Sequence, residues 1–359
     1  MTIHIFNPEH DIALASNLAN FTAPHAGRQL RHDLGFLPAL WAADGDVVLV
    51  DDVEAAQRAY EKVAHAVNRQ IGCLPCANHR FAPWKPMVFP AETCALEPWG
   101  WNRAVKARLE RCGVEAELLP TDEWLESVRQ LSHRRTSAQL LPRLQREGTV
   151  GEAFECRAVG EVEALAARFG RIVMKAPWSS SGRGVRFADF AACHEAQKAN
   201  SDGWLHHVVE RQGSVMVEPY YDKVKDFGME FTCTPAGEIC YQGLSLFHTT
   251  NGAYTGNVLA TERVKREKLS RYVSMELLDD VQQNICALLG PVLRGRYAGP
   301  FGIDMMVVAG GFLHPCVEIN LRRTMGHVAL ALSPKDDDIE RVMRIENAGH
   351  NYKLKIQRL

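Results

Sequence analysis

The 359-residue sequence lacks the features that would place it in a membrane, secreted or nucleic-acid-binding class. It does not open with a basic segment followed by an apolar core, and no apolar run approaches the length that crosses a bilayer. A formal net charge of −2 provides no overall positive field, so nucleic acid and anionic membranes are poor default partners. We therefore expect a cytoplasmic protein that acts on small molecules.

Cysteine is present but sparse, with ten residues scattered along the chain. The dense framework of a small secreted domain is missing, so we expect reduced thiols. One run, Cys73, Cys76 and His79, has the C-x-x-C-x-x-H spacing of a zinc or redox site. No second ligand pair lies nearby to complete a tetrahedron, so the pattern favours ordinary packing residues over a metal site without deciding between them.

What is present is typical of a globular α/β protein. Hydrophobic residues make up 46% and charged residues 23% of the chain, as expected for a protein that buries a core. Short apolar runs at residues 3–6 and 47–50 predict strands, and residues 53–66 have the pattern of a helix. Residues 81–101 are rich in proline and tryptophan with little periodicity, which predicts an irregular crossing.

Further along the chain the pattern predicts helices and antiparallel hairpins. A hairpin is expected from strands over residues 301–308 and 312–319, joined by an Ala-Gly-Gly turn. Residues 275–289 carry apolar side chains on one helical face. Gly290 and Pro291 are expected to end that helix, because neither residue favours its continuation.

Two segments have the composition of a nucleotide site. Lys175 ends an apolar strand, and residues 179–184 form a loop of serine, glycine and one arginine. Such a loop lets backbone N–H groups approach phosphate oxygens, and the lysine supplies a countercharge. Residues 215–217 form another apolar strand that runs into residues 218–220, where backbone groups can read a base. Each segment alone is equally typical of an ordinary loop or strand.

Three oxygen-bearing side chains are predicted on one face of the 301–319 hairpin. Glu318 and Asn320 share a face because side chains alternate along a strand, and the apolar neighbours of Asp304 point largely the other way. Clustered oxygen ligands suit Mg²⁺ bridging nucleotide phosphates, although an exposed sheet face also carries solvated polar groups. Arg322 and Arg323 follow directly, and guanidinium groups suit either a phosphoryl group or a substrate carboxylate.

In their order and approximate spacing, these segments resemble the ATP-grasp superfamily over roughly residues 121–330. Familiar members are D-alanine-D-alanine ligase, biotin carboxylase and carbamoyl phosphate synthetase. The resemblance implies an α/β (α+β) fold, with a Rossmann-like domain at residues 1–120 and two α+β subdomains at 121–210 and 211–359 that hold ATP between them. It also implies ATP with Mg²⁺ or Mn²⁺, and an acylphosphate formed on a small-molecule carboxylate and attacked by an amine or another nucleophile.

The resemblance also implies roles for individual residues. Lys175 would contact the α and β phosphates, the serine-glycine loop would cover them, and either Asp226 or Glu230 would bind the ribose. The implied nucleotide-binding residues are Lys175, Ser180, Ser181, Gly182, Gly184, Glu218, Pro219, Tyr220, Asp226 and Asn257. The implied metal ligands are Asp304, Glu318 and Asn320, and the implied catalytic cations are Lys175, Arg322 and Arg323.

Several points stay open at this level. Where the family has an earlier phosphate-binding lysine, this chain has Arg134 and Arg135, and the sequence does not say which of them binds phosphate. A small-molecule kinase, a nucleotide-binding protein without turnover and a homodimer are all compatible with the motifs. Near the N-terminus, Asp11 and Arg28 either line the acceptor site or serve local structure, with Asp11 capping a helix.

Overall fold

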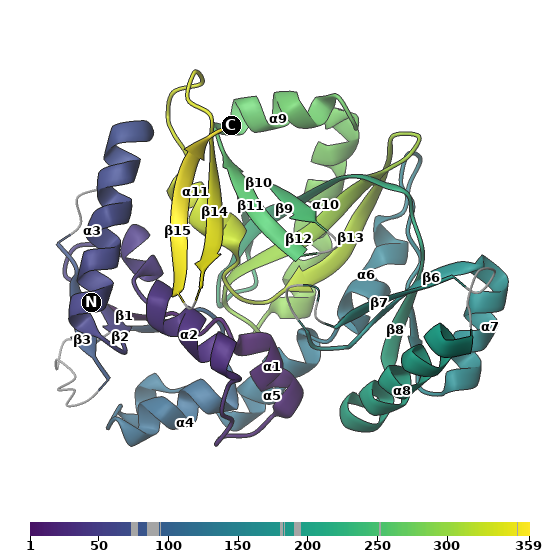
Figure 1. The fold of residues 1–359 in the computed structure, drawn as a ribbon, viewed down its shortest axis with the longest axis horizontal. Coiled ribbons are helices and arrows are strands. Elements are labelled where there is room, and N and C mark those ends of the chain that lie inside the picture. The colour runs from purple at the N-terminus through teal and green to yellow at the C-terminus, as the bar shows by residue number, and fades with distance from the viewer. Residues whose placement is uncertain are drawn as a thin grey trace.

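The computed structural model describes residues 1–72, 78–84, 93, 95–179, 182, 184–189, 195–250, 253–349 and 351–359. Within these ranges the chain forms one parallel and two antiparallel sheets (Figure 1). No helix in the described ranges has both the length and the apolar character needed to cross a bilayer. The mixed α/β class predicted from the sequence is confirmed.

The N-terminal sheet is parallel and has four strands. Its strands in spatial order are β3 (Arg80–Pro83), β2 (Val47–Val50), β1 (Thr2–Ile5) and β4 (Ala95–Pro98). The accompanying helices are α1 (His10–Ser16), α2 (His25–Leu34), α3 (Val53–Gln70) and α4 (Arg103–Arg111), with short 3₁₀ turns η1 (Leu37–Leu40) and η2 (Ala116–Leu118). The strands and the helix predicted from residues 3–66 are confirmed.

The prediction of an irregular crossing at residues 81–101 is wrong at both ends of that segment. Residues 81–83 belong to β3, and β4 occupies residues 95–98. Both strands are short and end in proline, so they have no visible alternation of their own. They form because β2 and β1 offer unpaired backbone groups along their edges, which is a tertiary effect.

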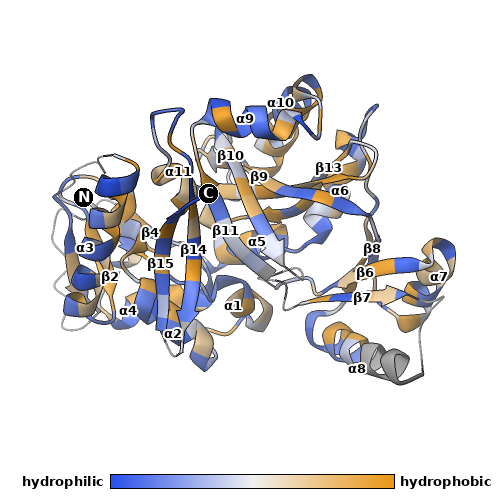
Figure 2. Ribbon diagram, turned by 45° about the horizontal axis from the view of Figure 1, so that its top comes forward, coloured by the Kyte–Doolittle hydropathy of each residue, from blue (hydrophilic) through white to orange (hydrophobic). Residues whose placement is uncertain are grey.

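The smaller antiparallel sheet also has four strands. Its order is β5 (Phe154–Cys156), β8 (Val215–Pro219), β6 (Arg171–Lys175) and β7 (Val185–Asp189). Helices α7 (Val159–Phe169) and α8 (Glu195–Gln212) pack against it through a separate apolar core. Figure 2 shows hydrophobic and hydrophilic residues alternating along α7, as an amphipathic helix on a sheet requires.

The central sheet has seven antiparallel strands and carries the largest core. Its order is β13 (Phe312–Asn320), β12 (Gly299–Val308), β9 (Lys223–Cys233), β10 (Ile239–Thr250), β11 (Ala253–Leu259), β14 (Arg341–Ala348) and β15 (Asn351–Arg358). Its helices are α5 (Asp122–Leu131), α6 (Arg135–Leu144), α9 (Glu262–Ser270), α10 (Met275–Leu293) and α11 (Met325–Ala331). The predicted hairpin is β12–β13.

Helix α10 passes through the predicted stop at Gly290 and Pro291 and ends at Leu293. Gly290 is required for close packing, because a Cβ there would lie 2.9 Å from the carbonyl oxygen of Gly237. Leu293 is buried in the central core, so packing stabilises the extra turn despite the proline. Here a residue pattern that is typical of helix ends serves a tertiary contact.

The C-terminal hairpin β14–β15 joins the central sheet to the N-terminal domain. It extends the seven-stranded sheet beyond β11, and β15 also packs on α2 and α3 (Figure 1). Met343, Leu354 and Ile356 share a core with Phe6 and Leu34. The predicted domain boundaries stay a prediction, and packing of this kind crosses them.

Candidate functional site

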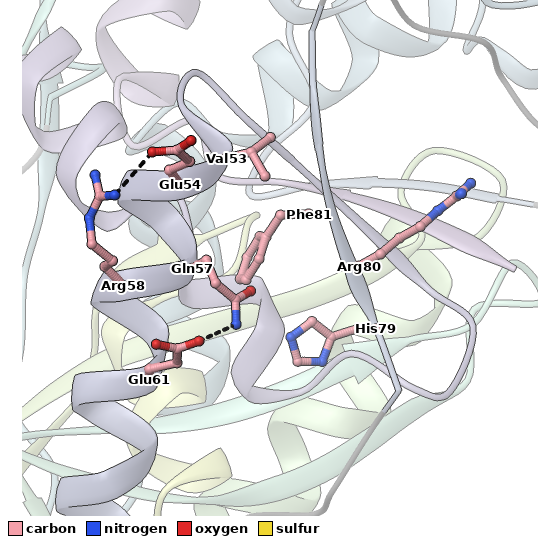
Figure 3. Close-up of a pocket in the computed structure, with 8 residues that line it drawn as sticks. All are labelled: Val53, Glu54, Gln57, Arg58, Glu61, His79, Arg80 and Phe81. Carbon is pink, nitrogen blue, oxygen red and sulfur yellow. Dashed lines mark hydrogen bonds and ion pairs between the residues drawn. The ribbon is translucent and has the colours of Figure 1, made fainter.

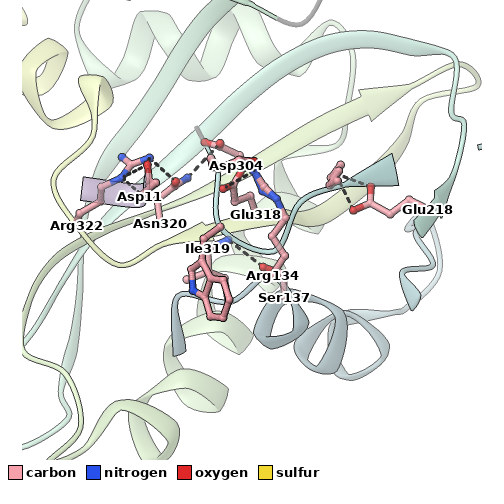
Figure 4. Close-up of polar contacts among 12 residues, drawn as sticks. Asp11, Arg134, Ser137, Glu218, Asp304, Glu318, Ile319, Asn320 and Arg322 are labelled. Atoms are coloured by element: carbon pink, nitrogen blue, oxygen red, sulfur yellow. Dashed lines mark hydrogen bonds and ion pairs between the residues drawn. The ribbon is translucent and has the colours of Figure 1, made fainter. Parts of the chain in front are cut away.

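The three side chains predicted as metal ligands lie together on β12 and β13. Asp304 is the direct cross-strand partner of Glu318, and the Asn320 amide donates a hydrogen bond to Oδ2 of Asp304 at 3.2 Å (Figure 4). Directly opposed residues of an antiparallel pair point to the same face. The alternation used in the sequence therefore placed these groups correctly with respect to one another.

Both carboxylates are half-buried, with the Glu318 side chain 24% exposed, and their surroundings disfavour ionisation. Burial raises the pKa of Asp304 to about 7, and the neighbouring charges of Glu318 and Glu230 add to the effect. Burial also raises the pKa of Glu318, although Arg134 opposes this. Groups that resist ionisation for these reasons gain most from a nearby cation, so this donor set fits a hard divalent ion.

Arg134, and not Arg135, faces these carboxylates. It precedes α6, and one guanidinium nitrogen lies 2.9 Å from Oε1 of Glu318 and 3.1 Å from the Ser179 carbonyl oxygen. Its Nε and other terminal nitrogen are buried and have no hydrogen-bond partner among the residues that the structure describes. Arg135 points instead toward Glu155, at 3.7 Å. Two unsatisfied guanidinium nitrogens beside a carboxylate pair suit an anionic ligand such as phosphate.

Five side chains form one row of polar groups, here called the carboxylate row: Arg134, Glu318, Asp304, Asn320 and Arg322. Arg322 lies at the end opposite to Arg134. It forms a two-pronged ion pair with Asp11, at 2.9 and 3.1 Å, and donates to Oδ1 of Asn320 at 2.8 Å (Figure 4). Burial opposes ionisation of Asp11, but the charges of Arg322, His10 and Arg134 together with the Arg322 hydrogen bond outweigh it and lower the pKa of that carboxyl. Asp11 makes no cap: α1 has no side-chain cap hydrogen bond, and Glu9 occupies its N-cap position. The capping alternative for Asp11 is therefore wrong.

Arg323 diverges from Arg322 and leaves the row. Its guanidinium lies 3.1 Å from Glu97 on β4 and stacks 4.6 Å over the ring of Trp41. The structure therefore does not bring this predicted catalytic cation to Asp304 and Glu318. The backbone N–H of Arg323 also donates to the Trp99 carbonyl oxygen at 2.8 Å, which holds this residue against the N-terminal domain.

Lys175 and Glu218 form a buried ion pair at the ends of β6 and β8. The lysine ammonium lies 2.6 and 2.7 Å from the two carboxylate oxygens. Its charge reaches the carboxylate row, because it lowers the pKa of Glu318 against the effect of burial. Glu218 therefore orients Lys175, and a nucleotide base at this strand end would be read by backbone groups, not by the Glu218 side chain.

The predicted phosphate loop connects β6 to β7. Ser180 and Ser181 lie outside the described residues, so only part of the loop can be placed. Gly182 has a φ of +71°, and a Cβ on Gly184 would lie 2.3 Å from the Ser179 side chain. Gly182 is thus favoured by its left-handed backbone, and Gly184 by the close approach of the Ser179 side chain. Pro219 ends β8, and the Arg171 guanidinium lies 3.8 Å over the ring of Tyr220, the next residue.

The two candidate ribose acids have different surroundings on β9. Asp226 accepts a hydrogen bond from Lys223, and its side chain is 15% exposed. Glu230 is buried beneath α11, where it accepts from Thr324 at 2.8 Å and lies 3.0 Å from Nδ1 of His327. Asp226 is the more accessible of the two, and its ribose role stays a prediction.

Asn257 is placed inside the sheet and takes part in its internal hydrogen bonding. It is 1% exposed, donates to Ser245 Oγ at 2.8 Å and accepts from the Tyr254 hydroxyl. Both polar ends of its amide are therefore engaged, one by Ser245 on the neighbouring strand β10 and the other by Tyr254 on its own strand β11. A direct contact between Asn257 and a nucleotide would require these bonds to rearrange.

The described cavities do not coincide with the carboxylate row. One of about 500 Å³ lies between α3 and β3, where Glu54 with Arg58 and Gln57 with Glu61 form local contacts (Figure 3). His79 lines it, packed edge-on to the rings of Tyr60 and Phe81. Cys73 and Cys76 lie outside the described residues, so the C-x-x-C-x-x-H pattern stays unresolved.

In the part of the chain that the structure describes, no group of three or more His, Cys, Asp or Glu side chains is arranged to hold a metal ion. Asp304 and Glu318 provide two carboxylates, and Asn320 provides an amide. An ion at this position would therefore take its remaining ligands from water or from a bound phosphate. Mg²⁺ commonly binds in this way, through one or two carboxylates and substrate phosphates.

Comparison with known proteins finds similarity in structure only. No family model matches the sequence, and no curated protein matches it. The biotin carboxylase domain of the Hydrogenobacter thermophilus 2-oxoglutarate carboxylase is 13% identical, with a TM-score of 0.52 over 96% of this chain and 74% of that one. Biotin carboxylase from Campylobacter jejuni is 11% identical, with a TM-score of 0.51 over 96% and 75%.

A third solved structure, N5-carboxyaminoimidazole synthetase from Staphylococcus aureus, is 12% identical and covers 96% of this chain and 82% of its own, with a TM-score of 0.49. The two biotin carboxylases are the basis of the fold assignment, since both exceed a TM-score of 0.5. Biotin carboxylase is a member of the superfamily that the sequence motifs resemble. The chain therefore has the ATP-grasp fold.

Proposed function

We propose that this protein is an ATP- and Mg²⁺-dependent ligase, which transfers the γ-phosphoryl group of ATP to a carboxylate and lets an amine or another nucleophile attack the acylphosphate. The observation that carries the proposal is the half-buried row in which Arg134 and Arg322 flank the opposed carboxylates of Asp304 and Glu318. The fold supports it, because one biotin carboxylase was solved with MgADP and bicarbonate and the other with an ATP analogue.

The cations of the site have separate tasks in this proposal. Arg134 presents its two unsatisfied guanidinium nitrogens to the phosphates, while its third nitrogen pairs with Glu318 and holds the side chain in place. Lys175 uses two of its three donors on Glu218 and has one left for a phosphate oxygen. Because both side chains are held before a nucleotide binds, little reorganisation is needed during phosphoryl transfer.

Asp304 and Glu318 hold the divalent ion, with Asn320 beside them. When bound, Mg²⁺ would neutralise charge that redistributes over the phosphates. Arg322 is oriented by Asp11 and Asn320, which places its guanidinium where a substrate carboxylate or the transferring group would meet it. The acylphosphate forms on the substrate itself, so the protein supplies positioning and electrostatics and needs no nucleophile of its own.

The test is ADP and phosphate release from Mg·ATP by the purified protein, in the presence of pools of amino acids, small carboxylic acids and polyols. Release that needs both a carboxylate and an amine supports the ligase, and release with polyols alone would indicate a kinase. We expect Lys175→Ala to reduce turnover by about 100-fold or more, because one fixed phosphate contact is lost. Lys62→Ala, at an exposed position of α3, is the matched control. If the wild-type protein fails to bind ATP, the proposal is wrong.

A further inference from the structure

A second polar cavity lies in the N-terminal domain, beside the carboxyl end of β1. Its volume is about 220 Å³, and it is enclosed by α1, the segment after it, α2 and α4. Its charged lining residues are Glu9, Arg28, Arg31, Arg108 and Arg111. Four guanidinium groups thus surround one carboxylate, in a protein whose net charge is −2.

Two of these arginines form a rigid wall. Arg31 pairs with Glu9 and with Asp51 at 3.2 Å, and Arg108 donates to the same Asp51 at 2.8 Å. Arg108 also lies flat against the ring of Trp84, 3.6 Å from its centroid. Glu9 and Asp51 fix these two guanidinium groups and balance their charges, so the excess positive charge of the cavity comes from Arg28 and Arg111.

The other two arginines are free to meet a ligand. Arg28 is exposed and uses one terminal nitrogen on the Ala23 carbonyl oxygen at 2.7 Å. Arg111 is exposed in the last turn of α4. Neither is ion-paired with a carboxylate in the described ranges of the chain. They therefore offer donors that a bound anion would satisfy.

We propose that this cavity binds the anionic group of a small molecule, a phosphate monoester or a carboxylate, between Arg28 and Arg111 and against the wall of Arg31 and Arg108. Guanidinium groups bind both kinds of anion through paired hydrogen bonds. The location agrees with this, since the carboxyl ends of parallel strands are where open α/β sheets bind ligands.

Helix α1 separates this cavity from the carboxylate row. Glu9 and Ala13 line the cavity, whereas Asp11, two residues from each, binds Arg322 on the other side. Helix residues two apart do not share a face. The anion site is therefore distinct from the proposed nucleotide site, and it does not depend on the proposed ligase activity.

The test is isothermal titration calorimetry at fixed ionic strength with inorganic phosphate, glycerol phosphate, succinate and, as a neutral reference, glycerol. We expect Arg28→Gln/Arg111→Gln to weaken anion binding at least tenfold. Arg143→Gln/Arg271→Gln removes the same two charges from exposed positions elsewhere and should change binding less than twofold. Arg28→Lys/Arg111→Lys keeps the charge but loses the planar fork, so intermediate affinity is expected.

Each titration is repeated with a saturating non-hydrolysable ATP analogue and Mg²⁺, so that phosphate binding at Lys175 and Arg134 is excluded. Tighter binding of glycerol phosphate than of succinate would identify a phosphorylated ligand, and the reverse order a carboxylate. Either order supports the site. The proposal is overturned if no anion gives saturable binding to the wild-type protein, or if both glutamine double variants lose binding equally.

Discussion

The two sides of helix α1 face polar sites of opposite character. On one side Asp11 meets Arg322 beside a pair of half-buried carboxylates that resist ionisation. On the other side Glu9 is the single carboxylate in a cavity lined by four arginines. Net charge predicts neither site, because a value of −2 averages over both. The local sign of charge decides that one side suits a cation with phosphates and the other an anion.

The two sites also differ in how strongly stability and turnover depend on each charged side chain. In the carboxylate row each charge is buried or half-buried and has a charged or amide partner, so removing one member leaves another unpaired at considerable cost. In the cavity, Arg28 and Arg111 are exposed, and such groups contribute little to stability. We therefore expect substitutions on the Asp11 side to have large effects on turnover, and those on the cavity side to affect anion binding alone.

The largest effect should come from Glu318→Gln. It removes one of the two opposed carboxylates while keeping the shape of the side chain and an oxygen for Arg134. We expect metal-dependent ADP release to fall by more than about 100-fold, because electrostatic stabilisation in a buried site is lost. Steady-state assays over a range of Mg²⁺ concentrations measure this, with circular dichroism to confirm the fold.

Glu155→Gln is the matched control for that experiment. It also removes a carboxylate next to an arginine, Arg135, but outside the row. Turnover within threefold of wild type is expected for it. Equal losses in Glu155→Gln and Glu318→Gln would contradict the special role given to the carboxylate row.

The next largest effect concerns the contribution of His10, on α1, to the pH dependence of the free energy of unfolding. His10 lies buried beneath Gly100, accepts a hydrogen bond from Asn102 through Nδ1 at 3.1 Å, and is faced by the charges of Asp11 and Arg322. Burial lowers its pKa from 6.5 to about 4. The unfolded state thus binds more protons between these pH values, so this residue's contribution to the free energy of unfolding falls as the pH falls through that window.

His10→Asn should remove that dependence while keeping an acceptor for Asn102. We expect the stability difference between wild type and His10→Asn to shrink, by on the order of 3 kcal/mol, as the pH falls from about 6.5 to about 4. Urea denaturation at half-unit pH steps measures it. A difference that stays constant over this window would show that His10 is not held neutral by burial.

The smallest of these effects should follow Asp11→Asn, which tests whether α1 serves the carboxylate row. Asparagine cannot reproduce the two-pronged ion pair with Arg322, so the guanidinium loses its fixed orientation. We expect kcat to fall about tenfold with the KM for ATP nearly unchanged, since Asp11 positions a group and does not bind the nucleotide. Asp11→Glu should restore part of the loss.

Glu126→Gln, on α5, is the control for Asp11→Asn, because it removes a partly exposed carboxylate that also pairs with an arginine. Anion binding to the arginine cavity should be unaffected by Asp11→Asn, since Asp11 does not line it. A loss of anion binding with normal turnover would reverse the assignment of the two sides of α1.

Most of the elements and site residues that were predicted correctly came from local sequence patterns. Alternation along residues 301–320 placed Asp304, Glu318 and Asn320 on one face, because the period of a strand is a property of the backbone itself. The strand that delivers Lys175 was predicted from its continuous apolar run, which is also a local feature. Failures occurred where neighbours outweigh local preference, as in β3, β4 and the last turn of α10.

By itself the sequence determined the elements, the order of the motifs and the shared face of the carboxylates, since each depends on residues close together in the chain. Only the tertiary structure decided that Arg134 and not Arg135 meets Glu318, that Arg323 leaves the site, and that Asp11 binds Arg322 across 311 positions. It also decided that arginines of α2 and α4 enclose one cavity. Such contacts depend on how distant segments pack, and no local periodicity encodes that.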